Sequence, residues 1–211
     1  ACFRDFLVNP GDYLYTFSDA VGPHPYPLMI RTFLEPVGIE TRNQFFNLLN
    51  KEPTIVVAPL NVPCNALSLI KPYLDTETKI VLVEVPFINE KGETKYLFKD
   101  GKVNPVHGCL TKSIFNNRTF TCEYHALASE CSYPAVSPEL LHLIESKRID
   151  VVQVSDLEAV ETMKEFSKLE GIVPSLGDSY SLAFIKNISK SGFSGSALMC
   201  FSEDGMKEID F

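Results

Sequence analysis

The sequence predicts an α/β fold of three layers around a mostly parallel sheet. Apolar runs of strand length alternate with helical patterns, and short links join them. Residues 54–58 (TIVVA) and 79–85 (KIVLVEV) are two such runs, and a helix over about residues 64–74 is expected between them. Runs that are apolar at every position are typical of central strands in parallel sheets, because helices cover both faces.

Two later helices have clear start signals. Ser137 fits an N-cap and Pro138 the first helical position of a helix that reaches about residue 147. After a short strand at residues 150–154, Ser155 and Glu158 form a capping box, in which each side chain satisfies a free backbone N–H group. The helix behind this box carries one predicted core-facing stripe, formed by Leu157, Val160, Met163, Phe166 and Leu169.

The C-terminal part predicts one further helix and one further strand. Asp178 is expected to cap a helix that ends near residue 188, and residues 196–201 (SALMCF) are expected to form the last strand.

Two regions interrupt the alternation. Residues 1–35 are rich in aromatic residues and prolines and form an N-terminal segment with a helix at residues 27–33. Residues 36–211 form a single α/β domain, from which residues 86–136 depart as a long irregular excursion with a hairpin turn near Asn116 and Asn117. Excursions of that length are usually functional or bound to a partner.

The composition excludes several classes of protein. Of the 211 residues, 45% are hydrophobic and 22% charged, which fits a globular protein with a sizeable core. The net charge is −8 and no basic run offers a surface for nucleic-acid phosphates. The apolar runs are too short to span a bilayer, so we expect a soluble protein. The chain begins with Ala1 and shows no signal peptide, which leaves open whether it is complete, processed or a fragment.

The six cysteines argue against a metal centre. They are scattered without the CxxC spacing of zinc sites, so no metal is expected. They fit buried thiols in a reducing intracellular compartment, either the cytosol or an organelle matrix. Cys109, Cys122 and Cys131 lie close enough in sequence to leave one disulfide open.

Several ordered motifs resemble the tryptophan synthase β subunit family, whose members are pyridoxal-phosphate (PLP) enzymes of fold type II. Residues 21–27 (VGPHPYP) are similar to its AGPHPYP, and residues 169–183 (LEGIVPSLGDSYSLA) to its LEGI-(I/V)-PALESSHALA. Residues 154–159 (VSDLEA) resemble its (V/I)TDEEAL. The resemblance implies the second domain of that fold, with residues 1–35 as the inter-domain stretch. It implies only the later half of a family chain, without the half that carries the PLP-binding lysine.

The resemblance also implies a degenerate active site. The family's phosphate cradle, GGGSN, aligns with a segment that has lost all three glycines, and its carboxylate beside the cofactor falls on Gly177. A cradle needs glycines so that successive backbone N–H groups can converge on an anion, and Pro63 has no N–H to donate. We therefore expect no catalytic residue and no bound cofactor, with PLP as the alternative. The remnants of the family site are Asn61, Val62, Pro63, Cys64, Asn65, Gly177 and Ser202.

Neighbouring positions of the family site are also rewritten. A family glycine falls on Glu130 and a family histidine on Tyr180. Asp178 is interpreted as a helix cap and not as a displaced carboxylate, and Asn65 as a turn or cap residue. A helix start can lower the pKa of a thiol such as that of Cys64, although a core contact is the simpler interpretation.

These losses favour a non-catalytic protein that acts as a structural or interaction subunit of a larger assembly. A second domain alone would expose the apolar face that meets the first, around residues 21–33 and 133–136. A protein partner or self-association should therefore cover that face. The alternative is half of a split PLP-dependent lyase, or a fragment of one, that performs β-replacement on serine with a lysine from another chain. A third interpretation is a small-molecule sensor that reuses the cleft without PLP.

Overall fold

The computed structural model describes residues 2–16, 18–116, 121–202 and 205–208, and its centre is a sheet of four parallel strands in the order β8-β2-β1-β9. The central pair pairs in register from Ile55 opposite Lys79 to Pro59 opposite Val83. This arrangement confirms the predicted α/β class with a parallel sheet. The strands are β1 (Ile55–Pro59), β2 (Lys79–Glu84), β8 (Asp150–Gln153) and β9 (Ala197–Leu198).

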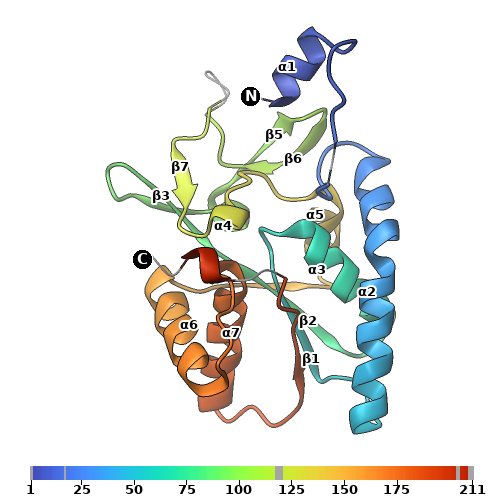
Figure 1. The fold of residues 1–211 in the computed structure, drawn as a ribbon, viewed down its shortest axis with the longest axis vertical. Helices are drawn as coiled ribbons and strands as arrows, with labels where there is room; N and C mark the ends of the chain where they lie inside the picture. The colour runs from blue at the N-terminus through green and yellow to red at the C-terminus, as the bar shows by residue number, and fades with distance from the viewer. Residues whose placement is uncertain (1, 17, 117–120, 203–204, 209–211) are drawn as a thin grey trace.

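Helices cover both faces of this sheet (Figure 1). On one side, α3 (Pro63–Ile70) and the short 3-10 helix η1 (Lys71–Tyr73) pack near β1, with α2 (Tyr26–Leu49) outside them. On the other side, α7 (Leu176–Lys190) packs on β1 and β2, and α6 (Asp156–Glu170) packs on α7. Because both faces are covered, β1 is buried along its whole length.

The helix α2 is longer than the predicted helix at residues 27–33. It has 24 residues and continues through Pro36, so the division of the sequence between residues 35 and 36 falls inside one helix. Gly38 lies where α2 meets α3, and a Cβ at this position would be 2.0 Å from the backbone oxygen of Ser68. The two helices therefore pack more closely than any side chain at Gly38 would allow. This packing outweighs the weak helix propensity of proline and glycine.

The start of α6 is as predicted. The Ser155 hydroxyl accepts the Glu158 backbone N–H at 3.4 Å, and the Glu158 carboxylate accepts the Ser155 N–H at 3.0 Å. These two bonds confirm the capping box.

The packing face of α6 differs from the predicted stripe. Ala159 and Thr162 are the buried residues of this helix, which packs on the neighbouring α7. Leu157 and Leu169 are 68% and 74% exposed. The predicted core stripe is therefore wrong at both of its ends, while Val160 and Met163 between them pack against the core.

The predicted start of α5 is confirmed, and the predicted start of α7 is corrected. Ser137 stands at the N-cap of α5 (Pro138–Glu145), as predicted, although its side chain makes no capping hydrogen bond. The helix α7 starts earlier than predicted, because Ser175 is its cap and accepts the Asp178 N–H at 3.1 Å. The prediction that Asp178 caps this helix is therefore wrong. The last strand, β9, is also shorter than the predicted strand at residues 196–201.

The excursion at residues 86–136 contains regular elements instead of irregular chain. One antiparallel sheet has the order β4-β3-β7, and β5 pairs with β6 in a second. At the predicted hairpin turn the Asn116 N–H donates to the Thr121 oxygen at 2.9 Å, and Asn117 lies outside the described residues. The elements are β3 (Pro86–Asn89), β4 (Thr94–Tyr96), α4 (Leu97–Asp100), β5 (Lys102–Val106), β6 (Cys109–Ser113), β7 (Tyr124–Ala126) and η2 (Ser129–Cys131). Outside the excursion, α1 (Cys2–Val8) and η3 (Gly205–Glu208) complete the chain.

Two further expectations concern the whole chain. No helix in the described ranges combines the length and the apolar character needed to cross a membrane. The cysteines with described side chains, Cys64, Cys109, Cys122, Cys131 and Cys200, are free thiols, so the disulfide left open among three of them is not formed.

Candidate functional site

The loop between β1 and α3 stands where the resemblance places the phosphate cradle. Asn61 is 3% exposed, and its side-chain oxygen accepts the backbone N–H of Val85 at 3.3 Å. Val62 is the N-cap of α3 with φ −119°, and Pro63 is the first helical residue. The side chains of this loop are therefore part of the core. Its backbone does not form the anion-binding nest that alternating negative and positive φ values create.

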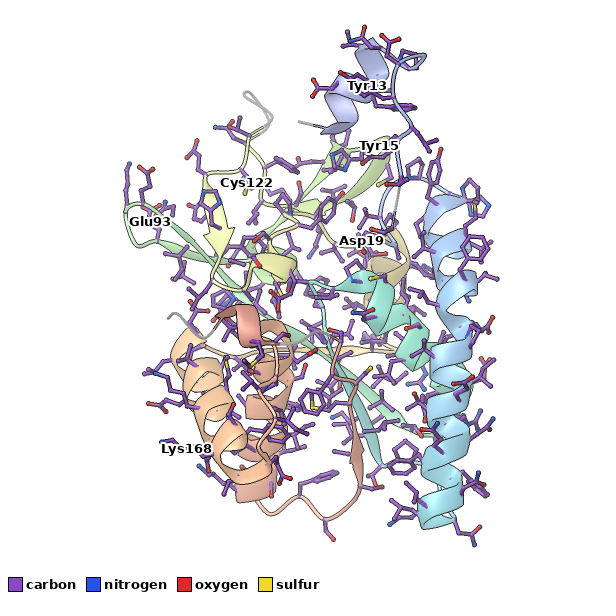
Figure 2. The ribbon with its side chains drawn as sticks, viewed as in Figure 1. Tyr13, Tyr15, Asp19, Glu93, Cys122 and Lys168 are labelled. Carbon is purple, nitrogen blue, oxygen red and sulfur yellow. The ribbon has the colours of Figure 1, made fainter. Side chains whose placement is uncertain are left out.

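The first turn of α3 offers few N–H groups to any external anion. Pro63 has none, and the Ala66 N–H donates to the Val62 oxygen at 3.1 Å. The carboxylate of Asp19 accepts the Ala20 N–H at 2.8 Å and lies beside the backbone N–H and the thiol of Cys64. Figure 2 shows Asp19 beside the start of α3. The residues that line this helix start do not fit the phosphate group of PLP.

The thiol of Cys64 is not activated by its place at a helix start. Burial, followed by the negative charge of Asp19, raises the pKa of Cys64 to about 11. Burial also raises the pKa of the Asp19 carboxyl, although its hydrogen bonds act in the opposite direction. The idea of a lowered Cys64 pKa is therefore wrong, because desolvation and the nearby Asp19 charge both raise the pKa. Asn65 lies in the first turn and accepts a bond from the Cys64 thiol at 3.7 Å, so it is not the cap of α3.

Gly177, where the family's carboxylate falls, lies against the side chain of Glu130. The Gly177 N–H donates to Glu130 Oε1 at 2.9 Å. A Cβ at Gly177 would be 2.7 Å from that oxygen and 3.1 Å from Cys131 Sγ. The two departures from the family pattern, a glycine replaced by Glu130 and a carboxylate replaced by Gly177, are thus in direct contact. A carboxylate therefore lies next to position 177, although the residue at that position cannot supply one.

Asp178 and Ser202 form the second contact at the start of α7. The carboxylate of Asp178 is fully buried, and it accepts the Ser202 N–H at 2.8 Å and the Ser202 hydroxyl at 3.1 Å. Tyr180, which stands at the family's histidine, is also buried and donates its hydroxyl to Asp156 Oδ1 at 2.5 Å. The Asp178 carboxylate and the Tyr180 hydroxyl thus both have hydrogen-bond partners within the fold, Ser202 and Asp156.

The predicted site residues gather at two helix starts. Residues 61–65 lie at α3, and Gly177 and Ser202 lie at α7. Asp19 was missed by the sequence analysis, because no motif marks it and its contact with Cys64 forms only in the folded chain. Within the described part of the chain, no three His, Cys, Asp or Glu side chains come together as possible metal ligands.

A different surface feature lies on α2. Tyr26, Met29, Phe33 and Val37 are spaced three or four residues apart, so they share one helix face, and all four are exposed. Residues 133–136 do not extend this apolar face, because Ala135 and Val136 are buried. The expected exposed apolar face is therefore present in part of residues 21–33. The prediction that it also includes residues 133–136 is wrong.

Comparisons with known proteins agree with this fold. The tryptophan synthase beta chain of Clostridium botulinum (strain Alaska E43 / Type E3) is 32% identical over 212 residues, which cover 100% of this chain and 52% of that protein. Tryptophan synthase beta chain 1 of Wolinella succinogenes is 31% identical over 213 residues, covering 100% and 53%. The solved structure of O-ureido-L-serine synthase has a TM-score of 0.62 at 12% identity, over 100% of this chain and 55% of that one. No protein-family model matches.

The chain has the α/β fold, with a parallel four-strand sheet, that is also found in the fold type II PLP enzymes. Within that class, the chain is a homologue of the tryptophan synthase beta chain along its whole length. It spans about half the length of the curated relatives it matches.

Proposed function

We propose that this chain is a non-catalytic tryptophan synthase β-like protein that serves as a structural or interaction subunit of a larger assembly and does not bind PLP. The observation that carries the proposal is the buried β1–α3 loop. Asn61 and Val62 pack into the core and Pro63 removes a donor, where a phosphate cradle requires open backbone N–H groups. Without these donors, the loop cannot supply the backbone hydrogen bonds that would bind the phosphate group of a cofactor.

The proposed interaction role is supported by the exposed apolar stripe of α2. Phe33 at its centre is 71% exposed, with Met29 and Val37 one turn away on either side. Side chains of this kind are enriched at protein interfaces, and a contiguous exposed set is a typical sign of a partner. We propose that a protein partner or a second copy of the chain covers this stripe.

The cofactor part of the proposal is tested with PLP itself. The purified chain is incubated with PLP and desalted, and the retained cofactor is measured by its visible absorption and by hydride reduction. We expect no retained cofactor. A stable absorption band that hydride removes would contradict the proposal.

The assembly part is tested on protein isolated from its source, by native gel and light scattering. We expect a complex, and we expect Phe33→Glu to dissociate it because a charge would be placed in the apolar contact. Leu169→Glu is the matched control, since Leu169 is equally exposed but lies on α6. A monomer of 23.6 kDa without a partner would contradict the assembly and favour the sensor interpretation.

One observation favours the alternative, half of a split PLP-dependent lyase acting on serine. The Glu130 carboxylate lies against Gly177, the position at which the family has its own carboxylate. This alternative requires a companion chain that supplies the lysine. Serine β-replacement activity in the mixed chains, lost in Glu130→Gln, would establish it in place of the first proposal.

A further inference from the structure

The side chain of Asp19 lies at the N-terminal end of α3 (Figure 2). Helix starts carry free N–H groups and a partial positive charge, and both attract anions. At α3 the supply of donors is small, because Pro63 has no N–H and the Ala66 N–H is used within the helix. The Asp19 carboxylate lies beside the backbone N–H and the thiol of Cys64 at this same place (Figure 2).

The segment that carries Asp19 is fixed in the fold. Ala20 and Val21, the next two residues, are buried in the core. The carboxylate also accepts the Ala20 N–H at 2.8 Å, which sets its direction. The backbone that carries Asp19 is therefore anchored in the core, and this fixes the position of its side chain at α3.

Two opposing effects act on the pKa of the Asp19 carboxyl group. Burial raises its pKa, whereas the bonds from Ala20 and Cys64 lower it, and burial has the larger effect. A second anion at this helix start would meet the charge of Asp19 at short range in a partly dry environment, where repulsion is strong.

We propose that Asp19 is a built-in anion that occupies the start of α3 and keeps phosphate esters out of the former cofactor cleft. The inference rests on the proposed function and deepens it. Loss of the cradle glycines removes donors, whereas Asp19 adds an internal competitor for the same end of the helix. Restoring the glycines should therefore not restore phosphate binding while Asp19 remains.

The test compares loop repair with and without removal of the carboxylate. Val62→Gly with Pro63→Gly reopens the loop, and the triple variant adds Asp19→Ser. Inorganic phosphate and PLP are titrated into each folded protein by calorimetry. We expect saturable phosphate binding in the triple variant, at least ten-fold tighter than in the double variant. Asp12→Ser in the double variant is the control, because Asp12 is exposed on the same segment.

The outcomes separate the two proposals. PLP binding by the parent chain would overturn the proposed function. If the parent chain does not bind and the double and triple variants bind phosphate equally, or neither binds it, the inference about Asp19 fails alone.

A second measurement needs no change to the loop. Asp19→Asn removes the negative charge beside Cys64 and keeps the size of the side chain. Because that charge contributes to the raised pKa of Cys64, the variant should react with iodoacetamide several-fold faster at Cys64 than the parent chain. Mass spectrometry resolves the labelled cysteine, and Asp12→Asn serves as the control. Equal labelling of Cys64 in Asp19→Asn and in the parent chain would contradict the placement of the carboxylate.

Discussion

Asp178, in the first turn of α7, accepts hydrogen bonds from both the backbone N–H and the hydroxyl of Ser202, at 2.8 and 3.1 Å. The contact ties the chain after β9 to the start of α7. Because the Asp178 side chain is fully buried, the two Ser202 donors take the place of water as its hydrogen-bond partners. By the sequence resemblance, Ser202 falls at a position of the family's cofactor site, and so does Gly177, the neighbour of Asp178. In this chain the pair stabilises the fold.

The first prediction concerns this pair. Ser202→Ala removes one of the two donors, so the free energy of unfolding should fall by about 1 kcal/mol. Asp178→Ala should cost more, about 1–3 kcal/mol, because it leaves the Ser202 donors without their acceptor. Urea unfolding measures both. Ser194→Ala, at an exposed position, is the control, and a Ser202→Ala effect no larger than that of the control would refute the role of the hydroxyl.

The second prediction concerns Gly177 and Glu130. Gly177→Ala places a methyl group against Glu130 Oε1, so the side chain must move and lose its bond to the Gly177 N–H. We expect a loss of about 1–2 kcal/mol. In a double-mutant cycle with Glu130→Ala, the two losses should not add, with a coupling of about 0.5 kcal/mol or more.

The control for this cycle pairs Gly177→Ala with Glu161→Ala, an exposed residue on α6. Those two changes should be additive. Additivity in both cycles would show that Glu130 and Gly177 do not interact.

The third prediction concerns the contact of α2 with α3. Gly38→Ala places a Cβ 2.0 Å from the Ser68 backbone oxygen, which a side-chain movement cannot relieve. The two helices must separate, and overpacking of this kind typically costs about 1–3 kcal/mol or more. Thermal unfolding measures the loss. Gly11→Ala is the matched control, because nothing lies within 4 Å of its added Cβ. Equal effects at the two positions would rule out the close helix contact.

The fourth prediction is a pH dependence of stability that arises from Glu84. Its buried carboxylate, at the end of β2, accepts the Phe98 N–H and a bond from Gln153 at 3.0 Å. Burial nevertheless raises its pKa above the ordinary 4.5. A raised pKa in the folded state means that the stabilising contribution is present below the unfolded-state pKa and is lost as the pH rises through the folded-state pKa.

Glu84→Gln cannot ionise and should not show this loss. Relative to the parent chain, the variant should therefore gain stability as the pH rises from about 3 to about 7, measured by urea unfolding. Glu90→Gln, at an exposed position, should show no such trend. A pH-independent difference between Glu84→Gln and the parent chain would count against ionisation of Glu84.

The sequence alone determined the elements whose signals are local. The apolar runs of β1 and β2 predict buried parallel strands, and Ser155 with Glu158 predicts a helix start within a single turn. The sequence also shows the absence of the cradle glycines at residues 61–65, because that feature depends only on residue type. These features need no knowledge of what lies across the fold.

Tertiary structure decided which groups meet. The length of α2 past Pro36 depends on the contact of Gly38 with α3, and the burial of α6 depends on which face α7 covers. The pairs Asp19 with Cys64 and Glu130 with Gly177 join residues far apart in the chain, and no local pattern marks them. Such contacts form when the layers of the fold pack together. Burial removes water, so each buried carboxylate needs hydrogen-bond donors from the protein.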